Sequence, residues 1–426
     1  MKGIIEKRKL LNRTRNKIRK IIFSLYLLTV KKINHLILSL VLLSCSSGET
    51  PDNEKSENKD TGKKQNLVTA DGKGAMLFLT DRPPNLETPL RYFLYDYTPN
   101  SVFFVRWHLS ELPKEILIDT FRLRINGNVK TELSLSLEDL KTKFTPYTVT
   151  ALCCCAGNAR SFCEPNVPGA QWKNGAMGNA KWTGVKLKDI LEKAGLKSGS
   201  VCVSFNGMDS PPLSGTPDFV KSLDINHCND GKVMIAYEMN GESLPMLNGY
   251  PLKLVVPGWY ATYWVGMLNE IKVYTEPYKG FWMEKAYLIP KGKKDANENH
   301  DSLSKDMEPI NKIGVRSLFV TPEPDSILKT GIDYEIQGIA FDGGDGIAKV
   351  EISMDGGKTW TVTKLDAEIG KYSWRRWRHK FTANAKGEYT FLVKATNVKG
   401  ETQPAHHWNR SGYMRNEIES LTVKVQ

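Results

Sequence analysis

The densest group of reactive side chains lies in the stretch 151–163, which reads Ala-Leu-Cys-Cys-Cys-Ala-Gly-Asn-Ala-Arg-Ser-Phe-Cys. Neighbouring side chains of an extended segment point to opposite faces, so Cys153, Cys154 and Cys155 are not expected to hold one ion together. A buried cysteine is usually a small apolar residue. Cys155 differs, because the Ala-Gly-Asn after it favours a flexible loop that can bring a thiolate to a soft metal. We predict that Cys155 is a metal ligand.

The other cysteines predict no second metal site. The chain has seven cysteines but no Cys-x-x-Cys pair for zinc. It also has no Cys-x-x-Cys-His for covalent haem, so we expect no c-type haem in this chain. The cysteine spacing matches no small disulfide scaffold, and it leaves open whether Cys202 and Cys228 pair.

Basic side chains that could bind an anion occur at two places. In Phe103-Phe-Val-Arg-Trp-His108 the period of a strand puts Arg106 and His108 on the same face. Arg160 follows Cys155 by five residues. Planar guanidinium groups offer paired donors to a compact oxyanion, and apolar neighbours favour this role over a solvated surface position.

The apolar pattern over residues 81–295 predicts a mixed α+β domain that positions these groups. It predicts a half-buried strand over 121–125 and a buried strand over 253–256. An apolar helical face runs over 185–194, and Gly195 is a natural end for that helix. Helix signals are few and short, so we expect a substantial sheet content.

A polar linker over 296–311 separates this domain from a different pattern. Residues 348–354 alternate strictly between apolar and polar side chains, and Asp355-Gly-Gly357 is a turn. One face of a later strand carries Tyr389, Phe391, Val393 and Ala395. Short strands separated by Gly and Asp turns predict an all-β immunoglobulin-like sandwich over 312–426.

Together these motifs resemble the sulfite oxidase family of molybdenum enzymes. The resemblance is closest to the bacterial sulfite dehydrogenases that pass electrons to a separate cytochrome c, and it covers roughly residues 85–426. It rests on several motifs in one order. These are Phe103–His108, Cys155-Ala-Gly-Asn158, Gly169–Trp172, Gly175–Val185, Ala236–Pro245, Val255–Gly258 and Trp282–Tyr287.

The resemblance implies a molybdopterin-binding domain of the sulfite oxidase type, followed by a sandwich that serves as a dimerisation domain in a homodimer. It implies that Cys155 ligates molybdenum, that Arg106 and Arg160 bind the oxyanion substrate, and that His108 contacts the pterin. It also implies that Tyr287 lies beside the metal. Trp172 is expected at the pocket wall, with ordinary core packing as the alternative.

The sequence departs from the family pattern at three places. Where vertebrate members have His-Gly-Phe-Pro-x-Arg at the cofactor phosphate, this chain has Asn248-Gly-Tyr-Pro-Leu-Lys253. Asn248 can still donate a hydrogen bond, and Lys253 can still meet a phosphate. A further cofactor-side lysine of the family falls at Gly266. Ser411 stands where the family has a substrate arginine, with Arg410 displaced by one, so a third guanidinium in the pocket is in doubt.

The expected activity is oxidation of sulfite to sulfate by oxo transfer, with the electrons passed to an external cytochrome c. Two alternatives stay open. One is a dehydrogenase subunit for sulfane sulfur or for a thiosulfate pathway, with the same architecture. The other is a non-catalytic surface binding protein with a degenerate cofactor domain.

The charge distribution predicts no nucleic-acid partner. The formal charge is +12, but residues 1–35 hold eleven Lys or Arg and one Glu and so carry +10 of it. The remainder is nearly neutral, which argues against a large phosphate-binding surface. With 40% hydrophobic and 10% aromatic residues, most of the chain can bury a core, so disorder is excluded for it.

The basic segment is part of a secretory signal predicted over 1–44. Lys31 and Lys32 precede a short apolar run over 36–43, which is too short for an ordinary membrane span. Leu42-Leu-Ser-Cys45 resembles a bacterial lipobox, which implies a lipid on Cys45 and a periplasmic or cell-envelope lipoprotein. An uncleaved anchor is the alternative.

The residues on either side of the apolar run complete this prediction. Residues 1–29 fit poorly with a compact signal, so we expect Val30 to mark its start. Residues 45–80 begin with a stretch rich in Ser, Glu, Asn, Lys and Asp, which predicts a flexible tether.

Overall fold

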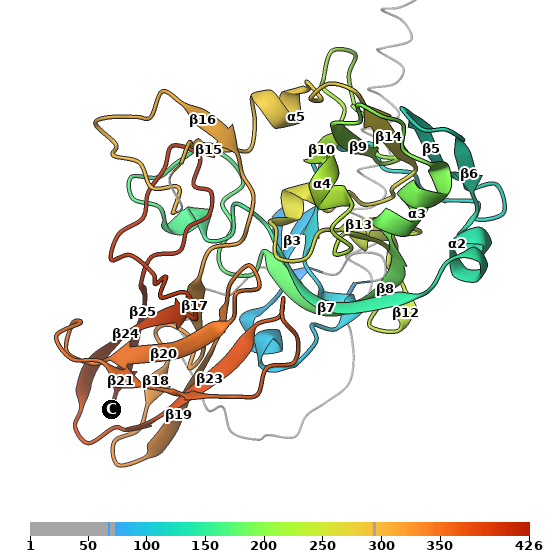
Figure 1. Ribbon diagram of the computed structural model, residues 1–426. Coiled ribbons are helices and arrows are strands. Elements are labelled where there is room, and N and C mark those ends of the chain that lie inside the picture. Colours follow the sequence, from blue (N-terminus) through green and yellow to red (C-terminus); the bar gives the residue numbers. More distant parts are fainter. Residues whose placement is uncertain (1–66, 69–72, 293–294) are drawn as a thin grey trace, which may run out of the picture. The chain divides into compact units, whose positions relative to one another are not determined.

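The computed structural model describes residues 67–68, 73–292 and 295–426 (Figure 1). The signal predicted for 1–44 and the lipid-attachment site at Cys45 therefore lie outside the described residues.

A small antiparallel sheet begins the described chain and corrects the end of the predicted tether. Strand β2 lies inside the segment 45–80, but it pairs with β3, and its first residue, Met76, is fully buried. Apolar burial along β2 accounts for order where a tether was expected. The sheet has the order β1 (Leu67–Val68), β2 (Met76–Thr80), β3 (Asn85–Glu87) and β4 (Val105–Arg106).

The strand predicted over 121–125 belongs to a mixed five-stranded sheet. It appears as β5, in which Leu123 and Ile125 are buried while Arg124 is exposed, as the alternation predicts. β5 pairs in parallel with β14 and antiparallel with β6. The sheet has the order β10 (Lys221–Asp224), β9 (Cys202–Asn206), β14 (Glu270–Tyr274), β5 (Leu123–Gly127) and β6 (Leu133–Leu135).

A second five-stranded sheet carries the cysteine motif. Its strands β7 and β8 pair antiparallel over eight residues, and the last four residues of β7 are buried. Gly178 in β8 leaves room for the ring of Phe103, since a Cβ at that glycine would lie 2.6 Å from the ring. The strands are β7 (Tyr147–Cys154), β8 (Met177–Lys186), β11 (Met234–Met239), β12 (Glu242–Ser243) and β13 (Lys253–Val255), which pairs with β11.

The α-helices are short, as expected. The helix predicted over 185–194 begins two residues later, because Val185 pairs with Ile235 in the sheet, and Gly195 ends it with a φ of 68°. A reciprocal capping box between Ser136 and Asp139 starts α2. Among the described residues, no helix combines the length and the apolar character that crossing a membrane requires. The α-helices are α2 (Leu137–Lys143), α3 (Leu187–Ala194), α4 (Ile225–Cys228) and α5 (Phe281–Glu284).

Single 3-10 turns connect several strands. They are η1 (Leu90–Leu94), η2 (Asn100–Val102), η3 (Arg160–Phe162), η4 (Met246–Asn248) and η5 (Ala261–Tyr263).

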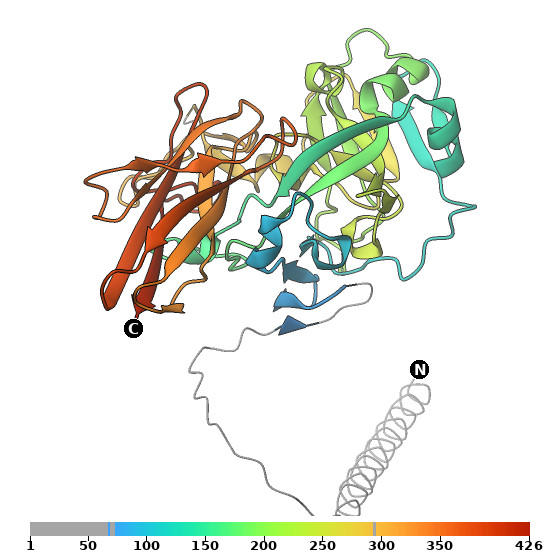
Figure 2. The ribbon, with the colours of Figure 1, turned by 90° about the horizontal axis from the view of Figure 1, so that it is seen from below.

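The C-terminal part forms the predicted sandwich from two sheets, drawn in orange and red in Figure 2. Its core includes Trp377, Phe391 and Val393, which are at most 1% exposed. One sheet has the order β17 (Arg316–Thr321), β19 (Asp333–Phe341), β23 (Arg375–Thr382) and β22 (Lys364–Leu365). The other has the order β18 (Ile327–Leu328), β25 (Glu419–Val425), β24 (Gly387–Asn397), β20 (Ile347–Ser353) and β21 (Thr361–Val362).

The segment 296–311, predicted as a linker, is packed into the fold. Its strand β16 (Met307–Pro309) pairs with β15 (Leu288–Pro290). The carboxylate of Glu298 is fully buried and forms an ion pair with Arg410. Polar composition predicted a linker, but Glu298 is buried and paired with a half-buried arginine.

Candidate active site

Cys155 lies one residue beyond the end of β7, where the chain leaves the sheet. Its N–H donates to the carbonyl of Ala176 at 2.9 Å, and Asn158 N–H donates to the carbonyl of Cys155 at 3.0 Å, which closes a tight turn. The side chain is 6% exposed and lines a pocket together with Cys153. Cys154 is buried and does not line it, so the predicted alternation holds.

Of the two thiols that line the pocket, those of Cys153 and Cys155, Cys155 is the better candidate for a metal ligand. The six described cysteines are all free, so the structure has no bond between Cys202 and Cys228. Burial raises the pKa of Cys153 to about 12, which keeps that thiol protonated. No group of three or more His, Cys, Asp or Glu in the described ranges could hold a metal. A metal at Cys155 would therefore take its other ligands from a cofactor.

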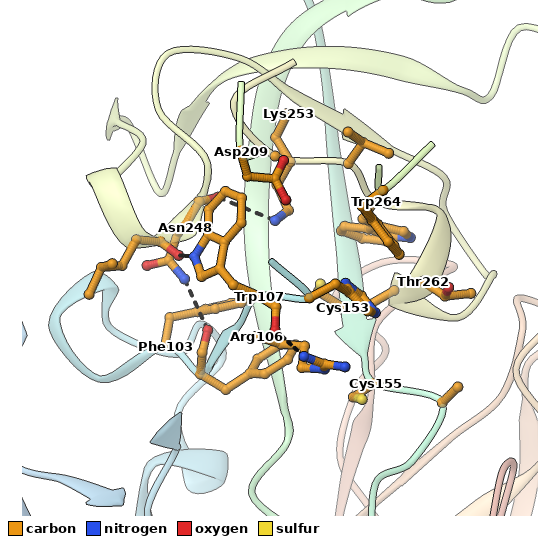
Figure 3. A pocket seen from close by; sticks show the side chains of 18 of the residues that line it. Phe103, Arg106, Trp107, Cys153, Cys155, Asp209, Asn248, Lys253, Thr262 and Trp264 are labelled. Atoms are coloured by element: carbon orange, nitrogen blue, oxygen red, sulfur yellow. Dashed lines mark hydrogen bonds between the residues drawn. The ribbon is translucent and has the colours of Figure 1, made fainter. Parts of the chain in front are cut away.

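In front of Cys155 lies a pocket with about 50 Å³ of space for the centres of water-sized molecules. In Figure 3, Arg106 and Cys155 lie at one end of the view, and Asn248 and Lys253 lie toward the other. The lining residues are Phe103, Phe104, Arg106, Trp107, His108, Cys153, Cys155, Ala156, Asp209, Phe219, Leu247, Asn248, Lys253, Ala261, Thr262, Trp264, Val265, Gly266 and Tyr287.

Arg106 and His108 both line this pocket, as their spacing predicted. The guanidinium of Arg106 donates to Asn85 Oδ1 at 3.3 Å and to the carbonyl of Trp107. The ring of His108 stacks on Phe219 with centroids 3.7 Å apart. Desolvation, with the nearby charges of Arg106 and Lys221, holds the pKa of His108 well below its usual range. His108 is therefore neutral at physiological pH.

Tyr287 is joined to His108 by a hydrogen bond between its hydroxyl and Nε2. The tyrosine is 6% exposed, and its ring stacks on Tyr413 of the sandwich with centroids 5.1 Å apart. Its backbone has a φ of 58°, a conformation that costs a residue with a side chain about 1–3 kcal/mol. Burial raises the pKa of Tyr287, so the phenol keeps its proton. The structure thus brings together three predicted site residues, Arg106, His108 and Tyr287.

Arg160 lies behind the Cys155 loop and is not among the lining residues. It is 7% exposed, with Nε donating to the carbonyl of Ser411 and Nη1 to the carbonyl of Ala170, both at 3.0 Å. Its charge stands 5.2 Å from the ring centroid of Tyr413. Gly157 makes room for it, because a Cβ there would lie 2.7 Å from the guanidinium. Arg160 contributes positive charge near Tyr287 from behind the pocket surface.

Trp172 is fully buried in the hydrophobic core. It is not among the residues that line the pocket. Of the two interpretations of this residue, the structure favours core packing over the pocket wall.

Asn248 and Lys253 line the pocket as predicted, but the amide of Asn248 is engaged within the protein. Its Nδ2 donates to the carbonyl of Phe104 at 3.0 Å, and its Oδ1 accepts from the amine of Lys73. Lys253 donates to the carbonyl of Asn248 at 3.2 Å. Burial, with the charge of Lys253, lowers the pKa of Lys73 to about 7. Lys253 is thus the better placed of the two predicted phosphate contacts.

The cations in and around the pocket lack acidic partners. None of Lys73, Arg106, Arg160, Lys221 or Lys253 forms an ion pair within the described part of the chain. Isolated buried charges are costly, so an excess of unpaired cations around one pocket indicates an anionic occupant.

This environment fits the molybdopterin that the family resemblance implies. The cofactor carries a phosphate, which Lys253 can meet, and it needs one protein thiolate for its metal, which Cys155 offers. The hydroxyl of Thr262, which lines the pocket, is buried without a hydrogen-bond partner. A Cβ at Gly249 would lie 2.8 Å from the Cα of Gly266, so the two backbone segments pass each other closely beside the pocket, and no side chain fits between them. Each feature suits a polar organic group seated there.

Ser411 and Arg410, where the sequence departs from the family pattern, are both engaged within the protein. The carbonyl of Ser411 accepts from Arg160, and its N–H donates to Asn409 Oδ1 at 3.2 Å. Arg410 is held by Glu298, with Nε donating to the two carboxylate oxygens at 3.0 and 3.1 Å, and by the carbonyl of Ser304. Arg410 is therefore committed to a structural ion pair.

Several residues at the site escaped the sequence analysis. Lys73 falls in the segment predicted as a tether, and Lys221 sits in an ordinary strand pattern. Asp209, a lining residue, follows a turn-like stretch, and burial raises the pKa of its carboxyl to about 7. Tyr413 comes from the sandwich. Only long-range packing brings these side chains together, so no local pattern could have indicated them.

Comparison with known proteins supports the assignment of a molybdopterin-binding domain. The family model described as "Oxidoreductase molybdopterin binding domain" matches residues 109–282, and "Mo-co oxidoreductase dimerisation domain" matches residues 307–426. The chain is 34% identical to the mitochondrial sulfite oxidase of Rattus norvegicus, over 82% of this chain and 66% of the relative, so it spans about two thirds of that protein's length. It is 31% identical to the sulfite oxidase of Gallus gallus, over 79% of this chain and 75% of the relative.

A solved structure has the same fold. The crystal structure of the sulfane dehydrogenase SoxCD from Paracoccus pantotrophus matches with a TM-score of 0.69 and 24% identity, covering 90% of this chain and 96% of that chain.

Proposed function

We propose that this chain, which belongs to the sulfite oxidase family of molybdopterin-dependent oxidoreductases, oxidises sulfite to sulfate and passes the electrons to an external cytochrome c. The observation that carries the proposal is the placement of the Cys155 thiol in one pocket with Arg106 and with the hydrogen-bonded pair His108 and Tyr287.

The reaction balances as sulfite plus water giving sulfate, two protons and two electrons. A molybdopterin cofactor, its metal held by the Cys155 thiolate, would supply the oxo-transfer and two-electron chemistry. The chain supplies positioning and electrostatics. Each electron reduces one molecule of cytochrome c, so one sulfite reduces two.

The side chains near Cys155 suit a small anion. Arg106 offers a guanidinium fork to sulfite oxygens. The neutral ring of His108 fixes the Tyr287 hydroxyl at the pocket surface, where the phenol can hydrogen-bond a substrate oxygen. Aromatic walls such as Phe103 and Trp264 exclude water, which strengthens these charged interactions.

Lys253 carries out a separate task away from Cys155. Its amine lies at the pocket surface, and its pKa is lowered by burial. A cofactor phosphate beside it would stabilise the charged amine. We assign Lys253 to cofactor retention and the group around Arg106 to substrate binding.

A combined assay tests the proposed function. The purified full chain should contain about one molybdenum per chain and should reduce cytochrome c when sulfite is added. A parallel reaction with a sulfane-sulfur substrate separates the two sulfur chemistries. Molybdenum without sulfite-dependent reduction would reject the substrate, and a chain that never binds molybdenum would support the non-catalytic alternative.

Assembly and location belong to the same proposal. The match to a Mo-co dimerisation domain supports a homodimer formed through the sandwich, which sedimentation analysis would test. The Leu42–Cys45 motif supports export and a lipid on Cys45. Replacing Cys45 with Ala should release the protein from the membrane fraction, and an unchanged distribution would reject lipid attachment.

A further inference from the structure

Lys221 is a fully buried lysine that the proposed chemistry does not use. It opens strand β10 and is 0% exposed. Its amine donates to the carbonyl of Trp282 at 2.6 Å, and it forms no ion pair within the described residues. A buried ammonium without a carboxylate is destabilising unless another group compensates for it.

The surroundings of this amine point toward the substrate end of the pocket. Lys221 Nζ lies 5.2 Å from the ring centroid of Tyr287 and 4.7 Å from that of Tyr263. It is also close enough to His108 to lower the pKa of that ring. Tyr287 and His108 line the pocket, so Lys221 stands directly behind the surface they form.

Other basic groups do not replace it there. Lys253 donates to Asn248, and Arg410 is held by Glu298. Ser411 carries no charge. Arg106 in the pocket and Arg160 behind it are thus joined on the Tyr287 side by one further cation, Lys221.

We propose that Lys221 is a specificity-determining cation that favours a doubly charged oxyanion over a singly charged or neutral ligand at the Tyr287 side of the pocket. The inference rests on the proposed function. Without an anion, burial lowers the pKa of Lys221 to about 7, so the buried amine carries its charge only in part; a bound dianion stabilises the charged form through the low-dielectric layer of Tyr287 and His108. Binding of the dianion then offsets the free-energy cost of burying the Lys221 charge.

This assignment has a consequence that a structural role lacks. If Lys221 served stability alone, an apolar replacement of similar length would destabilise the protein. If it serves anion binding, the same replacement removes an unpaired charge from the core, so the anion-free protein keeps or gains stability while its affinity for a dianion falls.

The experiment compares Lys221→Met with wild type in the cofactor-loaded full chain. Lys272→Met is the matched control, because Lys272 also lies over a tyrosine ring, 5.4 Å from the centroid of Tyr274, but is exposed. The melting temperature is measured with and without sulfate, a dianion of tetrahedral shape, at constant ionic strength. Sulfite KM and kcat are measured in parallel. The general salting effect of sulfate is common to all three proteins.

The expected result for Lys221→Met is a melting temperature without sulfate that is no lower than that of wild type, and a sulfate-induced shift reduced by at least about half. Sulfite KM should rise about tenfold, the effect of about 1.4 kcal/mol of lost anion binding, while kcat stays within about threefold. Lys272→Met should match wild type in every measurement.

An undiminished sulfate shift in Lys221→Met would overturn the inference, and so would a lower melting temperature with unchanged KM. If Lys221→Met fails to fold, Lys221→Gln is measured in its place, because a neutral amide keeps a donor for the Trp282 carbonyl. The proposed function can fail on its own. A wild-type protein that binds sulfate through Lys221 but does not oxidise sulfite would keep this inference and reject the activity.

Discussion

Arg316, the first residue of strand β17 in the sandwich, donates a hydrogen bond of 2.8 Å to Asn158, three residues beyond Cys155. The same guanidinium donates to Asn174 at 2.7 Å and forms an ion pair with the buried Glu419 at 2.6 Å. The sandwich therefore holds the loop that carries Cys155.

Replacing Arg316 with Met should destabilise the protein by about 3 kcal/mol, because it breaks a buried ion pair and leaves two amide oxygens without donors. Urea unfolding measures the loss. Arg316→Lys should lose less, because it keeps the charge beside Glu419 but not the fork that reaches Asn158. If both variants unfold like wild type, Arg316 does not support the loop.

Replacing Cys155 with Ser should lower sulfite-dependent turnover by about a hundredfold or more, while the protein stays folded, because a hydroxyl is a poor ligand for a soft metal. Steady-state kinetics and circular dichroism check the two parts. Cys154→Ala is the control, since Cys154 does not line the pocket and should keep most activity. Full activity in Cys155→Ser would remove the ligand assignment.

Replacing Tyr287 with Phe should reduce kcat/KM by about 10- to 100-fold, because the bond between the hydroxyl and His108 Nε2 is lost while the ring remains. Tyr413→Phe keeps the stacked ring pair and removes a hydroxyl that does not line the pocket, so it should stay within about threefold of wild type. Equal losses in the two variants would mean that the Tyr287 hydroxyl, with its bond to His108, has no special role in turnover.

Replacing Glu87 with Gln should change how stability depends on pH. Glu87 is 2% exposed, and burial raises its pKa to about 7. The folded state therefore binds more protons than the unfolded state between pH 4.5 and 7, so this group lowers stability as pH rises and its cost is complete above pH 7. Glu87→Gln should be more stable than wild type by up to about 3 kcal/mol at pH 8, and by less than about 1 kcal/mol at pH 5.

Thermal unfolding at the two pH values provides the measurement. Gln keeps an oxygen that can accept from the N–H of Lys173, as Glu87 Oε1 does at 2.5 Å. A stability gain of the same size at both pH values would show that titration of Glu87 is not its source.

Local patterns correctly predicted the elements that depend only on the residues within them. The alternation around Leu123 and the capping glycine at 195 both correspond to features of the structure. The helix start was displaced only because Val185 finds a strand partner 50 positions away. The placement of Cys155 and Cys154 relative to the pocket also followed from alternation alone.

The parts that the sequence could not predict depend on contacts between distant segments. The residues of β2 fit the pattern of a polar tether, and only their pairing with β3 makes them a strand. Glu298 fits a polar linker, and only its ion pair with Arg410 shows why it is buried. Trp172 carries no local mark that separates a pocket wall from a core. Lys221 is recognisable only when three-dimensional packing shows that its charge has no partner.

The two matched domains share backbone contacts as well as side-chain contacts. Leu152 N–H donates to the carbonyl of Tyr372 at 2.8 Å, and Met414 N–H donates to the carbonyl of Ala156 at 2.8 Å. Truncation of the chain after residue 311 would therefore remove hydrogen-bond partners on both sides of the turn that carries Cys155. We therefore expect that the domain before residue 312 does not fold stably alone. A replacement for the sandwich would also have to supply the backbone groups that contact Leu152 and Ala156.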